Sequence, residues 1–483
     1  NNLAEKIFEI KGEQIFENEI VRSYFSSFYN TETIKTWTNN KRCMNFLVKI
    51  GLSEIFLPET KQTREFIEEV NTSFKLHDYQ DFIKRKTSNF LLSNTNSKLM
   101  IQMPTGAGKT ALAMHSIYDF LRVSEEENPL IVWMAHTDEL CEQAIESFKI
   151  GWSGAGTKDV NLLRLWGNTN KDLDELPQTP VFAVASFQTA NSMIKTNKGK
   201  IFDLFLKIRN KSSLLVVDEA HMALAKTYNE AISFFAGNNC KIIGLTATPG
   251  RHGIDADAEE TENLADYFER NILNLNDFCG DRTPIKYLQD RKILSKVERL
   301  VLQTNFDLNF TKSEIKKLES TGLLSDKKLK ESGDDIKRTT LIIDQIQKLV
   351  ERKKKILVFS PSKDSSNIYA ALLKAKNIKA ESVTGDTSFS KRKRSVENFS
   401  DGNIDVLINY GVFTTGFDDP KIDCVVVARP TYSVVLYSQM IGRGLRGPEN
   451  NGTENCLLVD VLDNISSQPD IEIACNYFAN QWK

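Results

Sequence analysis

Several features that mark particular protein classes are missing from this sequence. Its 483 residues contain no apolar run of about 18 or more residues, so we expect no membrane-spanning helix. The net charge is −2, from 62 basic and 64 acidic residues, whereas a small chain devoted wholly to nucleic-acid binding is usually more basic. Near-neutrality still allows a basic groove on one face, because the field of such a groove is local.

Cysteine is scarce and shows no pairing pattern. None of the seven cysteines forms a CxxC pair and their number is odd, so neither a disulfide framework nor a zinc site is expected. Several lie inside apolar runs, as small core residues do, and a reducing cytoplasm is the simplest compartment. The cysteines are Cys43, Cys141, Cys240, Cys279, Cys424, Cys456 and Cys475.

The amino-terminal sequence, NNLAEKIFEIKGE, lacks the charged-then-apolar order of a secretory signal. It begins with Asn and not with Met, as a processed or trimmed end would. No repeat is found at a period of roughly 20 to 50 residues. What is present is an ordinary globular composition, with 41% hydrophobic and 26% charged residues, which can build large cores.

The chain length predicts about three domains, and changes in the sequence pattern place their borders. Residues 1–75 have apolar residues at helical spacing among charges, which indicates a helical N-terminal region. Residues 76–250 and 336–483 each alternate short aliphatic runs with helical stretches, the pattern of buried parallel strands. Residues 251–335 form a linker or accessory region. The predicted fold is α/β, with two tandem parallel-sheet domains, a helical N-terminal region and a charged helical linker.

The predicted strands are short and rich in aliphatic residues. The first series is KLMIQM, LIVWMA, NLLRLW, VFAVAS, SLLVVD and KIIGLTA, and the second is KILVFS, AESVTG, DVLINY, DCVVVAR and CLLVD. The stretch 311–337 is heavily charged with few large apolar residues, and we interpret it as a pair of solvated linker helices.

The stretch KLMIQMPTGAGKTALAMHSI has the order that a phosphate-binding loop needs, which is a strand, a glycine loop and a helix. The glycines let backbone N–H groups turn toward phosphate oxygens, and the helix N-terminus adds partial positive charge. Lys109 would reach the β- and γ-phosphates of ATP, and the Thr110 hydroxyl would bind Mg²⁺. The strict pattern asks for Gly where this chain has Met103, so the alternative is a glycine turn beside a surface lysine. The loop comprises Pro104, Thr105, Gly106, Ala107, Gly108, Lys109 and Thr110.

Two adjacent carboxylates, Asp218 and Glu219, end the predicted strand in LLVVDEAH. Burying both is costly without a cation, and Mg²⁺ bound to ATP would supply one. Asp218 then suits the Mg²⁺ shell, and Glu219 suits orienting and deprotonating the attacking water. A zinc ligand or a catalytic base is an alternative for His221, but it has no partner at metal spacing, so we assign it a coupling role between the domains.

With MPTGAGKT, DEAH, TATP and QMIGRGLR in this order, residues 75–465 resemble the superfamily 2 helicases and translocases of the DEAD/DEAH-box type. The resemblance is closest to the branch of RadD-type repair helicases and the motor subunits of type I restriction enzymes. It implies two RecA-like domains with ATP bound in the cleft between them, beyond the carboxyl ends of the strands.

The resemblance also assigns expected roles to further residues. Gln80, in LHDYQ, matches the adenine-reading motif, and TATP (246–249) matches the motif that couples hydrolysis to strand movement. The motif of the second domain that touches both nucleotide and nucleic acid comprises Thr415, Gly416, Phe417 and Asp418. The arginine-finger motif, which would reach the γ-phosphate from the other domain, comprises Gln439, Gly442, Arg443 and Arg446.

Hydroxyl and backbone N–H groups that follow strands in both domains are candidate contacts to nucleic-acid phosphates. The alternative for each is an ordinary strand-ending turn. The basic run KRKR (391–394) is either a phosphate patch or a solvated helix face. The candidate contacts are His136, Thr137, Ser186, Gln188, Thr189, Ser360, Ser362, Thr384, Gly385 and Thr415.

We therefore expect a nucleic-acid-dependent ATPase that uses ATP and Mg²⁺ to move along or unwind a strand. The GRGLR form of the finger motif favours DNA, in repair or in defence against foreign DNA, but this is analogy. No nuclease motif is evident, so cleavage would need a protein partner. Residues 1–75 either recruit that partner or simply pack on the motor domains.

Two other functions stay open at this point. One is an RNA-directed ATPase of the same superfamily, and the other is an ATP-gated nucleic-acid clamp or signalling module that does not unwind. A protein-translocating motor also uses paired RecA-like domains, but the middle region here is short and polar and holds no long preprotein-binding insertion.

Overall fold

The computed structural model describes residues 16, 18–52, 57, 67–68, 76–93, 97–167, 173, 175–237, 240–250, 258–413, 417 and 419–463. The chain divides into two compact units, Asn1–Arg64 and Glu65–Lys483. Among the helices within these described ranges, none is both long enough and apolar enough to cross a membrane.

The first unit contains two short helices, α2 (Glu19–Phe28) and α3 (Lys41–Lys49), which confirms the helical N-terminal region. Each begins at an asparagine whose side chain accepts from backbone N–H groups of the first turn, Asn18 for α2 and Asn40 for α3. Their apolar faces pack into a core of their own, and the buried Arg22 ties the surrounding loops by donating to backbone carbonyls. That core contains Phe16, Phe25, Ile34, Cys43, Phe46, Leu47, Ile50 and Leu52.

The second unit begins with an eight-stranded sheet in the order β1-β4-β5-β3-β6-β7-β2-β8. Every pairing in this sheet is parallel except that of β1 with β4. The six strands predicted from the sequence are all present, and the short strands β1 and β8 were not predicted. The strands are β1 (Ile67–Glu68), β2 (Lys98–Gln102), β3 (Leu130–Ala135), β4 (Asn161–Leu165), β5 (Val181–Ser186), β6 (Ser212–Asp218), β7 (Lys241–Thr246) and β8 (Ile272–Leu273).

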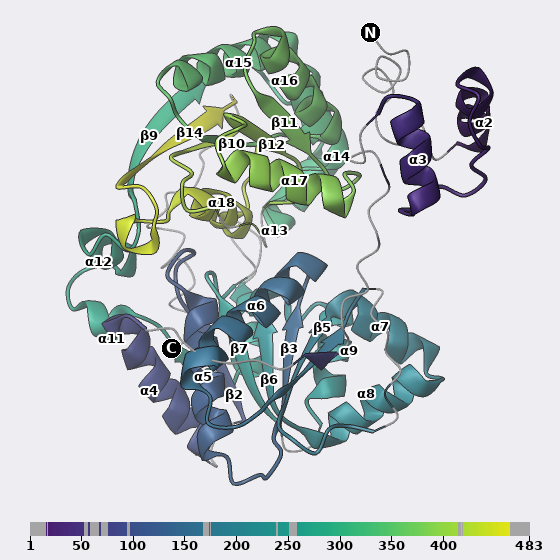
Figure 1. Cartoon of the computed structure of the whole chain (residues 1–483). Coiled ribbons are helices and arrows are strands. Elements are labelled where there is room, and N and C mark those ends of the chain that lie inside the picture. Colours follow the sequence, from purple (N-terminus) through teal and green to yellow (C-terminus); the bar gives the residue numbers. More distant parts are fainter. Residues whose placement is uncertain are drawn as a thin grey trace. The chain divides into compact units, whose positions relative to one another are not determined.

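Helices cover both faces of this first sheet (Figure 1), which explains why its strands are apolar throughout and do not alternate. One face packs against α4, α5 and α6, and the other against α7, α8, α9 and α10. The elements are α4 (Asp78–Leu92), α5 (Lys109–Val123), α6 (Asp138–Ala155), α7 (Phe187–Thr196), α8 (Lys200–Lys211), η3 (Ala220–Met222), α9 (Lys226–Phe235) and α10 (Ala258–Tyr267).

The second sheet has six parallel strands in the order β11-β12-β10-β13-β14-β9. The five strands predicted for it are present. The sixth, β9, comes from the stretch interpreted as a linker and pairs with β14 along its whole length. The strands are β9 (Lys296–Gln303), β10 (Ile356–Phe359), β11 (Ala380–Val383), β12 (Val406–Asn409), β13 (Cys424–Val427) and β14 (Asn455–Leu462).

This second sheet also has a core on each face, with α15 and α16 on one and α17 and α18 on the other. The two α/β domains together confirm the predicted fold class. The helical elements of this part are α11 (Asn276–Cys279), α12 (Pro284–Asp290), α13 (Lys312–Thr321), α14 (Asp326–Asp334), α15 (Ile336–Glu351), α16 (Lys363–Ala375), α17 (Phe389–Ser400), α18 (Val434–Ile441), η4 (Gly442–Gly444) and η5 (Pro448–Asn450).

The predicted pair of linker helices exists as α13 and α14, but α14 is not fully solvated. Leu329, Ser332 and Gly333 are buried, and an added Cβ at Gly333 would lie 1.9 Å from the Ser365 hydroxyl oxygen. α14 therefore packs closely on α16 of the second α/β domain.

Candidate functional site

The predicted phosphate loop joins β2 to α5, as the sequence pattern required. Gly106 and Gly108 have φ of +89° and +77°, a left-handed conformation that other residues rarely adopt. Space is restricted as well, because a Cβ on Gly108 would lie 2.3 Å from the Gln80 side-chain nitrogen. A Cβ on Gly106 would lie 2.8 Å from the Leu294 side chain. Both positions therefore require glycine.

Met103, where the strict phosphate-loop pattern has Gly, continues β2 and has no positive φ. Its N–H donates to the Thr246 carbonyl at 3.1 Å, as if the strand were one residue longer, and its side chain is fully buried in the core. Its carbonyl accepts from the Lys109 ammonium at 3.1 Å. Nothing at this position needs the conformational freedom of glycine, so the departure leaves the loop intact.

α4 holds the phosphate loop from one side. The Gln80 amide nitrogen donates to the carbonyls of Ala107 (3.2 Å) and Gly108 (3.3 Å), and the Tyr79 hydroxyl donates to the Ala107 carbonyl at 3.0 Å. The other end of the Gln80 side chain accepts from the His77 N–H at 2.9 Å. Gln80, assigned to adenine by resemblance, thus contacts the phosphate loop itself, and Tyr79 is a supporting residue that the sequence did not indicate.

The two carboxylates lie at the end of β6, beside the loop. Glu219 has a φ of +52°, an unusual conformation for this residue, and its N–H donates to the Asp218 carboxylate at 3.0 Å. Burial and the neighbouring Glu219 raise the pKa of Asp218 above its ordinary value. Burial also lowers the pKa of Lys109, although Glu219 and Asp218 oppose that change. The predicted lysine and both carboxylates therefore form one electrostatic cluster.

A chain of polar contacts leads from this cluster to TATP. The Nδ1 of buried His221 lies 3.3 Å from Glu219 Oε2 and 3.3 Å from the Thr246 hydroxyl. That hydroxyl donates to the Thr248 carbonyl at 3.0 Å and accepts from the Thr248 N–H at 3.1 Å. The coupling role expected for His221 has a direct physical route here, from Glu219 to the loop after β7.

The second α/β domain brings its arginine motif to the same place. In the turn after α18, Arg446 Nη1 donates to the Gly106 carbonyl at 2.7 Å, so an arginine of one domain contacts the phosphate loop of the other. Arg443 Nη1 donates to the Phe417 carbonyl at 2.7 Å, within its own domain, while its charge still acts on Lys109 and Glu219.

Close packing accompanies these contacts. A Cβ on Gly442 would lie 2.3 Å from the Thr105 methyl group, so glycine is required for this approach. Leu445 shares an apolar cluster with Met103 and Leu294. A small cavity remains between the domains, lined by Pro104, Thr105, Ala247, Thr248, Ile285, Ser438, Ile441 and Leu445.

Five further candidates for the nucleotide site remain. Thr110 follows Lys109 in the first turn of α5, and Gln439 lies in α18, one turn before Arg443; both are partly exposed. Thr415, Gly416 and Asp418 lie outside the described residues.

Several predicted nucleic-acid contacts are helix caps in the structure. The hydroxyl oxygens of Thr137, Ser186 and Ser362 accept the N–H of Leu140 (3.3 Å), Thr189 (3.2 Å) and Ser365 (3.0 Å) at the start of α6, α7 and α16. This local role is the strand-ending turn named above as the alternative. The Ser186 hydroxyl also donates to the Thr189 hydroxyl at 3.0 Å, and the Ser362 and Ser365 hydroxyl oxygens lie 2.6 Å apart.

The remaining candidates of this group have mixed surroundings. His136 stacks on Tyr228 and is hydrogen-bonded to its hydroxyl, and Ser360 donates to the Asn409 carbonyl at 3.0 Å. Gln188 and Gly385 are exposed, and the Thr384 N–H donates to the Thr387 hydroxyl at 2.9 Å. The basic run KRKR lies in the first half of α17. Its Arg392 forms an ion pair with Glu139 of α6, a contact between the domains that no sequence signal indicated.

Comparison with known families identifies both α/β domains. Residues 73–251 match the family described as type III restriction enzyme, res subunit, and residues 338–447 match the helicase conserved C-terminal domain. The chain belongs to the superfamily 2 helicases and translocases.

Two relatives are similar to most of the chain at low sequence identity. The chain is 28% identical over 397 residues to IRC3 of Saccharomyces cerevisiae, named as a candidate ATP-dependent helicase, covering 80% of this chain and 51% of that protein. It is 23% identical to a 51.5 kDa protein of Lactococcus phage isolate 7-9, covering 80% and 70%. The chain thus spans about half the length of the yeast relative.

A solved structure of S. cerevisiae Dbp5 bound to RNA and ADP BeF3 has 16% identity and a TM-score of 0.50, covering 83% of this chain and 87% of that chain. At this identity the likeness shows the fold alone.

Proposed function

We propose that this protein is a nucleic-acid-dependent ATPase that moves along or unwinds its strand, with DNA as the favoured substrate. The observation that carries the proposal is the contact of Arg446 with the Gly106 carbonyl, because it joins the two α/β domains at the phosphate loop. The motor domains would be residues 76–250 and 336–483, and β9, from the intervening region, extends the second sheet.

The residues present fit the nucleotide and its metal ion. Lys109 and the N–H groups at the start of α5 would hold phosphate oxygens, and the arginines would add positive charge when the domains are closed. The Thr110 hydroxyl and the Asp218 carboxylate are the hard oxygen donors that Mg²⁺ prefers. Burial beside Glu219 raises the pKa of Asp218, and a cation held there would favour its charged form.

Glu219 would orient and deprotonate the attacking water. Its left-handed backbone turns it away from the strand direction, and His221 orients its carboxylate. The contact of His221 with Thr246 would transmit the state of the nucleotide to the loop after β7. Movement along a strand follows if two phosphate-binding surfaces, one on each domain, alternate between tight and loose binding as the domains open and close.

The setting is proposed to be DNA repair or defence against foreign DNA. The GRGLR motif and the match to a restriction-enzyme family support this choice. Cleavage would be performed by a partner protein, and the first unit, with its own core, is a candidate surface for that partner.

The test is to measure ATP hydrolysis with single-stranded DNA, duplex DNA and RNA in parallel, together with strand displacement. Lys109→Ala serves as the inactive control in every arm. We expect DNA to stimulate hydrolysis and ATP to drive displacement. If only RNA stimulates ATP hydrolysis, the substrate is RNA and not DNA. If nucleic acid stimulates hydrolysis without strand displacement or movement, the protein is an ATP-gated clamp. An ATP hydrolysis rate that none of the three nucleic acids changes would refute the proposal.

A further inference from the structure

Arg429 lies two residues after the end of β13 and has no hydrogen-bond or ion-pair partner among the residues that the structure describes. Its guanidinium carbon lies 5.1 Å from the centre of the Tyr410 ring, and the side chain is partly buried. Burial lowers the pKa of Arg429, yet an arginine stays charged in proteins. A partly buried cation with its five N–H donors unused is costly, which is typical of a group that meets its partner only when a ligand binds.

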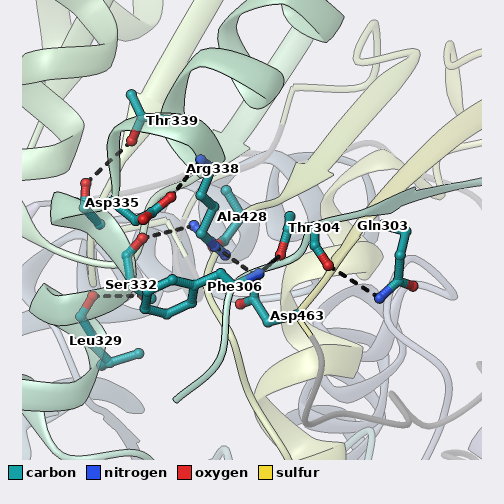
Figure 2. A network of polar contacts seen from close by, with 11 residues as sticks. Gln303, Thr304, Phe306, Leu329, Ser332, Asp335, Arg338, Thr339, Ala428 and Asp463 are labelled. Carbon is teal, nitrogen blue, oxygen red and sulfur yellow. Dashed lines mark hydrogen bonds and ion pairs between the residues drawn. The ribbon is translucent and has the colours of Figure 1, made fainter. Parts of the chain in front are cut away.

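A second arginine at the same end of the sheet has its hydrogen-bond donors satisfied by protein acceptors. Arg338, at the start of α15, is fully buried, and Figure 2 shows its guanidinium surrounded by acceptors. Its Nε donates to Asp463 at 2.8 Å and its Nη2 to the Ala428 carbonyl at 2.7 Å. Thr304 also donates to Asp463, at 2.5 Å. Because Ala428 precedes Arg429 directly, this network fixes the backbone from which Arg429 extends.

The surroundings of Arg429 come from neighbouring strand ends. Tyr410 follows β12, and its hydroxyl donates to Asp326 of α14 at 3.2 Å. Lys363, after β10, acts on Tyr410 through its charge and forms an exposed ion pair with Asp386 at 2.7 Å. Asp326 acts on Arg429 electrostatically but forms no ion pair with it. β12, β10 and β13 are adjacent in the sheet, so these groups share one carboxyl edge, where ligands of parallel sheets bind.

The partner that fits Arg429 is an anion at this edge, and it is not the phosphate of the bound nucleotide. The neighbours of Arg429 are Tyr410, which follows β12, and Asp326 of α14. The loop that would hold the nucleotide phosphates joins β2 to α5 of the other sheet, and the arginine that donates to it is Arg446. A planar guanidinium matches phosphate oxygens in a bidentate arrangement, and the phosphodiester backbone of a strand lying over the domain presents them.

We propose that Arg429 binds a backbone phosphate of single-stranded nucleic acid at the carboxyl edge of the second sheet, the edge at which Lys363 also lies. The proposal deepens the proposed function and rests on it. Arg338 is the positioning residue, through the Ala428 carbonyl.

The experiment measures binding of fluorescent oligothymidylate and oligouridylate by anisotropy, over a series of salt concentrations, for the full chain. Arg429→Gln should bind roughly tenfold more weakly at about 0.15 M salt and lower the slope of log K against log salt by about 0.7, the value for one phosphate of a single strand. Arg429→Lys, which keeps the charge, should lie between. The matched control is Arg352→Gln, since Arg352 is an exposed arginine of the same domain at the opposite, amino edge of the sheet.

The outcomes separate this inference from the function on which it rests. If the wild type binds an oligonucleotide and Arg429→Gln binds it with unchanged affinity and slope, the inference is wrong and the proposed function stands. A loss of affinity with an unchanged salt slope, or with an equal loss of ATP affinity, would indicate a structural role and also overturn it. If the wild type binds neither oligonucleotide, both proposals fail.

Discussion

The guanidinium of Arg446 donates a hydrogen bond of 2.7 Å to the carbonyl of Gly106, across the boundary between two α/β domains. Gly106 lies in the loop that would hold the phosphates of ATP, and Arg446 lies more than three hundred residues later in the chain. Any movement of one domain relative to the other must change this contact. In the proposed mechanism this contact would link the occupancy of the loop to the closure of the domains.

Glu219→Gln should remove turnover and keep nucleotide binding. The amide has nearly the same shape but cannot accept a proton from water, and general bases typically contribute about 10² to 10⁴ in rate. The measurement is steady-state ATP hydrolysis beside the affinity for a fluorescent ATP analogue. Glu230→Gln, on the exposed surface of α9, is the matched control and should behave like the wild type. Normal ATP turnover in Glu219→Gln would show that Glu219 is not the general base.

Gly442→Ala should impair closure without unfolding either domain. The added Cβ would lie 2.3 Å from the Thr105 methyl group, and a misplacement of this order costs about a hundredfold in turnover in well-positioned sites. Circular dichroism and the thermal midpoint should stay unchanged, because the domains can move apart to relieve the clash. Combining the change with Thr105→Gly should recover part of the loss relative to Thr105→Gly alone. Absence of any recovery would mean that the clash is not the cause.

Arg338→Met should destabilise the second α/β domain. It leaves the buried Asp463 carboxylate without its cation, and breaking a buried pair in this way costs about 3–5 kcal/mol. Hydrogen exchange followed by mass spectrometry should show lost protection in β13 and β14, while the first sheet keeps its protection. The control is Lys330→Met, which breaks the exposed pair with Asp364 and should change nothing measurable. Equal protection in Arg338→Met and Lys330→Met would contradict the structural role of the buried pair.

The buried cysteines should resist alkylation in the native protein. Burial raises the pKa of Cys456 to about 12 and that of Cys424 well above its ordinary value. Because the thiolate is the reactive form, raising the pH from about 7 to 9 should speed labelling of the unfolded chain but not of these two thiols in the folded one. Iodoacetamide labelling read by mass spectrometry, with and without urea, checks this. Rapid native labelling of Cys456 at neutral pH would show that its site opens.

The fold was largely predictable from the sequence because parallel strands covered on both faces leave uninterrupted aliphatic runs. All eleven predicted strands exist. β9 was missed because it lacks such a run. Its sequence KVERLVLQ mixes charges with aliphatic residues, as suits an exposed edge strand. β1 and β8, with two residues each, are too short to leave a pattern.

The site was predictable in its local parts but not in its assembly. The spacing of glycines before Lys109 predicts the loop, and the strand before Asp218 predicts the position of the carboxylates. No local pattern shows that Gly442 must pack against Thr105, that Met103 is tolerated because it extends a strand, or that Arg392 pairs with Glu139. These relationships arise only when distant segments meet. Arg429 was missed because a single arginine after a strand resembles any other.

The central claim is that the ATP site is built from residues of both α/β domains. The most direct test is ATP turnover of the wild type and of Arg446→Ala, each measured with and without saturating nucleic acid. The account predicts that nucleic acid stimulates the wild type and that Arg446→Ala binds ATP but loses roughly 10³-fold or more of the stimulated rate, the scale of an arginine finger. Turnover of Arg446→Ala at the stimulated wild-type rate would contradict the account, because the domain carrying Arg446 would then be dispensable for hydrolysis.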